Sequence, residues 1–202
     1  MGNIAPDSGV PNEDWTQFQP PKTLSHFKTK RSDNTYIDIE AFCAKYFNAD
    51  INKTYTKKEY SFFLGYYVHL LTDIEWIRTV YRPLLEAYPK EAAQDVHALI
   101  RKAKADWYDL DFLYLEQHPD FRAFSLYEHA ENYENVFMDI FRRDAFENRR
   151  KYICGFYRSD RHGNLYREYT YLRPEQADAF VDKTLAYLLS VKLKDGGFTV
   201  AR

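Results

Sequence analysis

The chain has 202 residues, which is the size of one compact domain and too short for two fused enzymes. Lys and Arg number 28 against 30 Asp and Glu, and the net charge of −2 argues against a dedicated duplex nucleic-acid binder, which usually carries a basic excess. The 15 Phe, 18 Tyr and 3 Trp far exceed what a disordered chain carries. We therefore expect one folded domain over residues 1–202.

The sequence predicts neither a membrane span nor an export signal. Its longest apolar run, residues 61–71, is much shorter than the roughly 20 residues that a membrane helix needs. The first residues carry acidic rather than basic side chains, unlike a secretory signal. The two cysteines, Cys43 and Cys154, could form at most one disulfide, which is typical of a reducing compartment. A cytoplasmic location is therefore expected, and the oligomeric state is left open.

Glycine and proline gather at the start of the chain: Gly2, Pro6, Gly9, Pro11, Pro20 and Pro21. Such residues favour turns and irregular backbone, so residues 1–35 are predicted to form an extended loop segment. Apolar residues then recur at helical spacing over 36–47, which indicates the first helix.

The central helix has the clearest signal. Thr56 and Glu59 have the spacing of a capping box, and the apolar segment that follows continues to about Val80, before Pro83. This segment is apolar nearly all round, which is typical of a helix enclosed by others.

Three more helices are predicted from capping signals and from the positions of proline. One begins at Pro89 and ends near Glu116, a second covers 125–148, and the last runs from Pro174 to about Lys194.

Between the last two helices, two β-prone segments, 151–157 and 165–172, flank a turn at 161–164. They predict a hairpin over residues 150–172. The expected fold is all-α: a multi-helix bundle around a central buried helix, with one small β-hairpin near the C-terminus.

His69 and Asp73 lie four residues apart on the central helix, so both side chains share one face. The rest of that face is aromatic and aliphatic, and an ionised carboxylate there is costly unless something pairs with it. A metal ion would satisfy both groups, because imidazole and carboxylate are ordinary zinc ligands. The alternative is a simple hydrogen bond between His69 and Asp73 within a helical core.

The irregular start of the chain offers two further ligands. Asp7 follows Pro6, and His26 lies in Lys-Thr-Leu-Ser-His-Phe, both in segments that can bend toward a helix face. Each alone is equally typical of a turn or a solvated loop. Together with the helix pair they give the set Asp7, His26, His69 and Asp73.

Three segments carry a specific resemblance: Gly-Asn-Ile-Ala-Pro-Asp at 2–7, Lys-Thr-Leu-Ser-His-Phe at 22–27 and Phe-Leu-Gly-Tyr-Tyr-Val-His-Leu-Leu-Thr-Asp at 63–73. In order and spacing they resemble the zinc-dependent phospholipase C family, including its many uncharacterised bacterial members. The resemblance implies an all-α fold and a single zinc ion bound by the residues that match the family's ligands, which are Asp7, His26, His69 and Asp73.

The chain also departs from that family. Family members have a helical segment before the Gly-x-x-Ala-Pro-Asp element, whereas this chain begins at Met1, so we expect either a missing N-terminal segment or no second zinc. The downstream His-x-x-x-Glu that holds a further metal has no match here. Ser8 and Thr23 stand where the characterised lipases have aromatic residues that recognise the headgroup. The resemblance therefore implies one metal, and choline specificity does not carry over from the characterised lipases.

The resemblance implies a zinc-dependent hydrolase of phosphodiester bonds, acting on a small phosphodiester or a phospholipid, with peripheral membrane contact as an open option. Asp7, besides binding the metal, would accept a proton from the attacking water. One alternative is a non-catalytic helical protein with one structural zinc. Another is a zinc hydrolase like the single-strand-specific nucleases, whose fold is related.

Other chemistry-bearing groups favour structural roles. Asp106, Asp109 and Asp111 surround two aromatic rings on the helix from Pro89, where a general base or solvated acids are both possible interpretations. The basic residues of 142–151 alternate with acids, which favours an ion-paired helix face. The remaining histidines, His97, His118, His129 and His162, are expected to be solvated or hydrogen-bonded rather than metal ligands.

Overall fold

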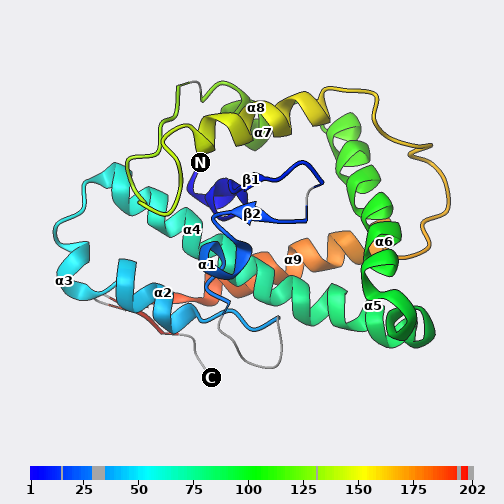
Figure 1. Ribbon diagram of the computed structural model, residues 1–202, viewed down its shortest axis with the longest axis horizontal. Coiled ribbons are helices and arrows are strands. Elements are labelled where there is room, and N and C mark those ends of the chain that lie inside the picture. Colours follow the sequence, from blue (N-terminus) through cyan, green and yellow to red (C-terminus); the bar gives the residue numbers. More distant parts are fainter. Residues whose placement is uncertain (15, 29–34, 131, 195–196, 200–202) are drawn as a thin grey trace.

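The computed structural model describes residues 1–14, 16–28, 35–130, 132–194 and 197–199, and helices make up most of it (Figure 1). The fold is all-α, as the sequence predicts. Among the described residues, strands occur in two antiparallel pairs only: β1 (Val10–Pro11) with β2 (Phe18–Gln19), and β3 (Lys192–Lys194) with β4 (Gly197–Thr199). Neither pair falls within residues 150–172, so the hairpin predicted there is wrong, and β3 and β4 form a different ribbon after the last helix.

The first segment is more ordered than the extended loop predicted for residues 1–35. It contains a 3-10 helix, η1 (Gly2–Asp7), the β1–β2 ribbon and a single helical turn, α1 (Lys22–Ser25). In Figure 1 this dark blue segment occupies the middle of the molecule, against helices α4 and α8. Tertiary contacts thus fold a stretch whose composition by itself indicates a loop.

Two short helices precede the central one. Helix α2 (Ile39–Tyr46) begins at Asp38, whose carboxylate accepts a hydrogen bond from the Ala41 amide, and α3 (Ala49–Asn52) follows. Helix α4 (Lys57–Trp76) begins with the predicted capping box: the Glu59 amide donates to Oγ1 of Thr56, and the Thr56 amide donates to Glu59.

Pro83 does not end the central helix as the sequence suggests. Helix α4 continues through a π-helical turn, η2 (Ile77–Tyr81), directly into α5 (Arg82–Ala87). Proline lacks an amide hydrogen and its ring clashes with the preceding turn of a regular α-helix. The wider π turn lies immediately before Pro83 and changes the helical period there, so the chain stays helical across the proline.

Helix α6 (Pro89–Gln117) confirms the helix expected from Pro89. Its backbone is interrupted at Asp95, which has non-helical dihedral angles. The Asp95 carboxylate accepts a hydrogen bond from the Ala98 amide, so Asp95 caps the second, longer part of the helix.

The predictions for residues 125–172 need correction. In place of one helix over 125–148 the structure has α7 (Arg122–Glu128), and α8 (Ala145–Tyr157) lies where the first strand of the hairpin over 150–172 was predicted. Three of the four buried residues of α8, Phe146, Arg150 and Cys154, follow a four-residue spacing, and the fourth, Ala145, is the first residue of the helix. This helical period and the i,i+3 pair of Glu147 with Arg150 outweigh the β-propensity of the aromatic residues.

Residues 158–173 form an irregular segment that replaces the rest of the predicted hairpin. Helix α9 (Pro174–Ser190) follows and begins at the predicted proline. No helix in the described part of the chain is both long and apolar enough to cross a bilayer. Both cysteines, Cys43 and Cys154, are free.

The main hydrophobic core forms around α4, which confirms its prediction as the buried central helix. Seven of its residues are buried: Phe62, Phe63, Tyr66, Tyr67, Leu70, Leu71 and Glu75. The six apolar and aromatic ones belong to one hydrophobic cluster with Phe42 of α2, Phe146 of α8 and Ala5 of η1. Since η1 packs into this core, the core fixes the position of the N-terminal segment over one face of α4.

Candidate metal centre

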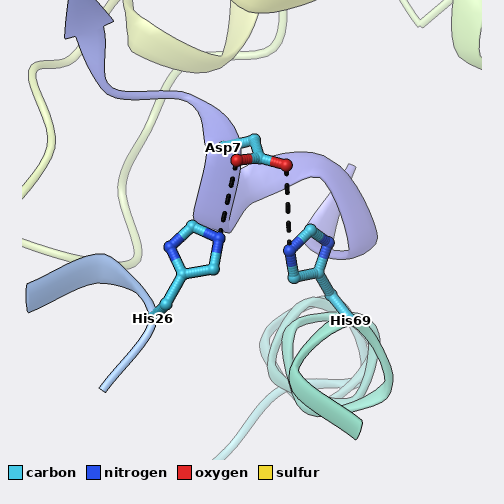
Figure 2. A group of neighbouring side chains, drawn as sticks. All are labelled: Asp7, His26 and His69. Carbon is cyan, nitrogen blue, oxygen red and sulfur yellow. Dashed lines mark ion pairs between the residues drawn. The ribbon is translucent and has the colours of Figure 1, made fainter. Parts of the chain in front are cut away.

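The structure brings all four predicted ligands together. Asp7 is the last residue of η1, His26 follows α1, and His69 and Asp73 lie one turn apart on α4. Figure 2 shows Asp7 above the two imidazole rings, with one carboxylate oxygen directed at each ring. Three segments that are distant in sequence thus present their polar side chains to one point.

The four side chains are joined by short N–O distances. Nε2 of His26 lies 3.5 Å from Oδ1 of Asp7 and 3.6 Å from Oδ2 of Asp73. Nε2 of His69 lies 3.8 Å from Oδ2 of Asp7 and 3.6 Å from Oδ2 of Asp73. Nε2 of each imidazole ring therefore faces both carboxylates.

His69 is held with Nε2 directed into the cluster. Its Nδ1 lies 2.7 Å from the carbonyl oxygen of Asn3, and because a carbonyl can only accept, Nδ1 is the donor in this contact. Nε2 is the nitrogen that faces the carboxylates. It is buried and has no hydrogen-bond partner among the described residues. A backbone carbonyl on the other ring nitrogen is the usual arrangement around a metal-binding histidine.

His26 is held in a similar way from the opposite side. Its Nδ1 lies 2.9 Å from Oγ of Ser25, and the hydroxyl of Tyr66 donates to the carbonyl oxygen of Ser25. His26, Ser25 and Tyr66 are all buried. The loop histidine is therefore anchored to α4 through Tyr66, although it comes from an irregular segment.

Two glycines allow η1 to approach α4 closely enough to build this site. A Cβ added to Gly65 would lie 2.8 Å from the Asn3 amide nitrogen, and one added to Gly2 would lie 2.0 Å from the Phe62 carbonyl oxygen. Real Cβ atoms are not found at such distances from backbone atoms. The contact between Asn3 and His69 therefore requires glycine, which has no Cβ, at positions 2 and 65.

Positive charges surround Asp7. Nζ of Lys22 lies 3.2 Å from Oδ1 of Asp7. Burial raises the pKa of the Asp7 carboxyl, but the hydrogen bond from His26 and the charges of Lys22, His69 and His26 outweigh it and hold that pKa well below its usual range. Lys28 and Lys104 also act on Asp7 through their charges. Three lysine side chains thus place positive charge around the Asp7 carboxylate.

The arrangement fits a zinc ion. Ligand atoms of a tetrahedral zinc site lie about 2.1 Å from the metal and hence about 3.4 Å from one another. The measured N–O distances of 3.5–3.8 Å are close to this value. Ligand atoms of Asp7, His26 and His69 all lie within 4.8 Å of one another, and two imidazoles with two carboxylates are a suitable donor set. The buried Nε2 of His69, which makes no hydrogen bond within the described residues and faces two carboxylates, is the observation that favours a metal most directly.

The other acidic candidates have structural roles. Arg167, in the irregular segment 158–173, donates from Nη2 to Asp106 over 2.7 Å and to Asp109 over 3.0 Å. Asp106 also accepts from the amides of Tyr171 and Leu172. These two carboxylates therefore anchor that segment to α6, and the possibility of a general base there receives no support.

The remaining histidines lie outside the centre. Within the described parts of the chain, a group of three or more possible metal ligands occurs only at Asp7, His26 and His69. Sequence reasoning missed Asn3, Ser25 and Gly65, which hold the ligands in place. Of these, Gly65 has a recognisable signal, because a glycine within a strongly helical segment often marks a close backbone approach.

Comparison with known proteins identifies no relative. No family model matches the chain, and no curated protein or solved structure shows significant similarity to it.

Proposed function

We propose that this protein is a zinc-dependent hydrolase of phosphodiester bonds, with Asp7, His26, His69 and Asp73 as the metal ligands. The observation that carries the proposal is the state of His69: its Nδ1 donates to Asn3, and its buried Nε2 has no partner other than the cluster. A hydrogen bond from one ring nitrogen to a backbone carbonyl is the usual way in which a metal-binding imidazole is oriented.

A zinc ion at this site would lower the pKa of a bound water toward about 7 and stabilise negative charge on the phosphoryl oxygens. The side chains of the site would supply the proton acceptor and leave room for the substrate. Asp7 presents both carboxylate oxygens to the cluster, so one can bind the metal while the other accepts the proton of the attacking water. The side chains of Asp7 and Asp73 are about one-third exposed, which leaves the centre accessible to a substrate.

The charges around the centre favour an anionic substrate. Lys22 forms an ion pair with Asp7, and the charges of Lys28 and Lys104 act on the same carboxylate. A phosphodiester carries one negative charge, and cations at the edge of a cleft raise the local concentration of such a ligand. The substrate class proposed is a small phosphodiester or a phospholipid headgroup.

A structural zinc is the second candidate. Four protein ligands complete a tetrahedral shell, and closed shells are typical of structural sites. The ligands also come from three separate segments, so a metal would fasten η1 and the segment after α1 to α4. In that case the ion stabilises the fold without hydrolysis.

The His69→Ala variant tests the proposal. Protein purified without chelator or affinity metal is analysed for zinc, for melting temperature and for hydrolysis of bis(p-nitrophenyl) phosphate, phospholipid vesicles and single-stranded DNA. We expect about one zinc per chain in the wild type and loss of both zinc and hydrolysis in His69→Ala. His129→Ala is the matched control, because His129 also donates from Nδ1 to a backbone carbonyl but lies outside the cluster.

Each outcome separates the candidates. Full zinc content in His69→Ala would contradict the metal site itself. Zinc that raises the melting temperature of the wild type, with none of the three substrates cleaved, would support the structural candidate. Cleavage of single-stranded DNA in preference to the other two would support a nuclease-like hydrolase.

A further inference from the structure

One cavity of the protein lies apart from the candidate metal centre and has a volume of about 500 Å³. It lies between η2 and α5 on one side and residues 170–173 and α9 on the other. None of the four metal ligands lines it. Its volume is within the roughly 300–1,000 Å³ range of small-molecule binding sites.

The floor of the cavity is apolar. Val80, Leu84 and Leu172 line it and are themselves buried. Helix α9 contributes Gln176, Ala179, Phe180 and Lys183, whose spacing places them on one face of the helix. The walls are fixed at both ends, because the Tyr88 hydroxyl donates to the Thr170 carbonyl oxygen over 3.2 Å and the rings of Trp76 and Phe180 pack edge to face.

The charged residues of the lining, Arg173 and Lys183, are both cations. No carboxylate lines the cavity, and within the described residues neither cation forms an ion pair. The guanidinium of Arg173 makes a long hydrogen bond from Nε to the side chain of Gln176, at 3.4 Å. The cavity thus combines an apolar interior with two cationic groups that have no protein counter-charge.

The backbone gives an independent indication of function. Two of the lining residues, Thr79 and Val80, belong to the π-helical turn η2. Such turns are rare in proteins and often occur at functional sites.

We infer that this cavity binds a fatty acid, with the alkyl chain against Val80, Leu84 and Phe180 and the carboxylate at Arg173 and Lys183. The apolar floor matches the chain, and the planar guanidinium of Arg173 suits a carboxylate. A neutral or cationic amphiphile would leave both cations unpaired. This binding is independent of the proposed hydrolase function, since no metal ligand takes part.

The test is calorimetric titration of the full chain with sodium laurate below its micellar concentration. Dodecyltrimethylammonium, with the same chain length and the opposite charge, is the comparison ligand. We expect laurate to bind and dodecyltrimethylammonium not to bind. Lys183→Gln should weaken laurate binding by about tenfold, the value of one charge-assisted contact. The control Lys151→Gln, on α8 and outside the lining, should bind laurate like the wild type.

Ala179→Phe fills the cavity from the face of α9 and should abolish laurate binding while far-UV circular dichroism stays unchanged. Unchanged laurate affinity in both Ala179→Phe and Lys183→Gln overturns the inference, as does equal binding of the two amphiphiles. The metal-site variant His69→Ala should bind laurate normally, so a failure of the hydrolase proposal leaves this result unaffected.

Discussion

The carbonyl oxygen of Asn3 accepts a hydrogen bond from Nδ1 of His69 over 2.7 Å, between residues that are 66 positions apart in the chain. This single contact orients the ring of a candidate ligand on the central helix from the first turn of the N-terminal segment. The metal centre therefore depends on how closely η1 packs against α4.

Replacing Gly65 by alanine tests this dependence. The added methyl group would lie 2.8 Å from the Asn3 amide nitrogen, so η1 must shift and carry both Asn3 and Asp7 away from His69. We expect zinc affinity to fall by at least tenfold in Gly65→Ala, as measured by competition with a zinc-binding dye.

The matched control is Gly155→Ala on α8, where an added Cβ meets nothing within 4 Å. Alanine at a helical position is more favourable than glycine by about 0.5–1 kcal/mol, so this variant should gain stability and keep its zinc affinity. Equal zinc affinity of Gly65→Ala and the wild type would refute the role given to the close approach.

Lys22→Gln should strengthen zinc binding. The ammonium of Lys22 pairs with Oδ1 of Asp7 and would repel a divalent cation at the same carboxylate. An exposed ion pair is worth about 0.2–1 kcal/mol, so its removal should tighten zinc binding by up to about fivefold in calorimetric titration at low salt. Lys53→Gln, which removes the exposed pair with Asp50, is the control and should leave zinc affinity unchanged. Weaker binding in Lys22→Gln would show that the lysine supports the site.

Asp106→Asn should destabilise the fold without affecting the metal. The Asp106 carboxylate is buried and accepts hydrogen bonds from Arg167 and from the amides of Tyr171 and Leu172. Removing its charge should cost about 2 kcal/mol in urea unfolding. The exposed Asp178→Asn on α9 should cost almost nothing. Loss of zinc in folded Asp106→Asn would contradict the separation of this anchor from the metal centre.

The stability of the protein should depend on Glu147 at acid pH. The hydrogen bonds from Arg150, which outweigh the cost of burial, lower the pKa of Glu147 from 4.5 to about 2. A carboxyl whose pKa is depressed in the folded state stabilises the fold above its unfolded pKa. That contribution is lost as the pH falls toward the folded value. Glu147→Gln should therefore cost up to about 3 kcal/mol at pH 7, and progressively less between pH 4.5 and 2.

Urea unfolding of the wild type and Glu147→Gln from pH 7 to pH 3 measures this difference. The control Glu134→Gln removes an ion pair with Arg143 that is mostly exposed, and should cost less than about 1 kcal/mol. A pH-independent difference for Glu147→Gln would mean that the carboxylate charge does not contribute to folding.

The sequence alone determined the helical elements that have local signals. The capping box at Thr56, the prolines at 89 and 174 and the apolar segment after Lys57 all mark real helices, because caps and periodicity act within a few residues. It also predicted the four residues that the structure brings together as a candidate metal centre, through the i,i+4 spacing of His69 and Asp73 and the family-like segments around Asp7 and His26.

Residues 150–172 mark where sequence reasoning failed. Aromatic and branched side chains suit a strand in isolation, but in this chain α8 buries Phe146, Arg150 and Cys154 along one helical face. The segment after α8 is held by Asp106 and Asp109 of α6, which are more than 50 residues earlier. β-propensity is a weak local preference, and side-chain burial and buried charge pairs exceed it.

Only the tertiary structure decided that the four ligands meet. The close approach permitted by Gly2 and Gly65 sets the position of Asp7, and the chain from Tyr66 through Ser25 sets that of His26. The orientation of His69 rests on a backbone carbonyl, which every residue type possesses and no sequence pattern can mark. Ligand types are local properties of a sequence, whereas their convergence depends on backbone packing between distant segments.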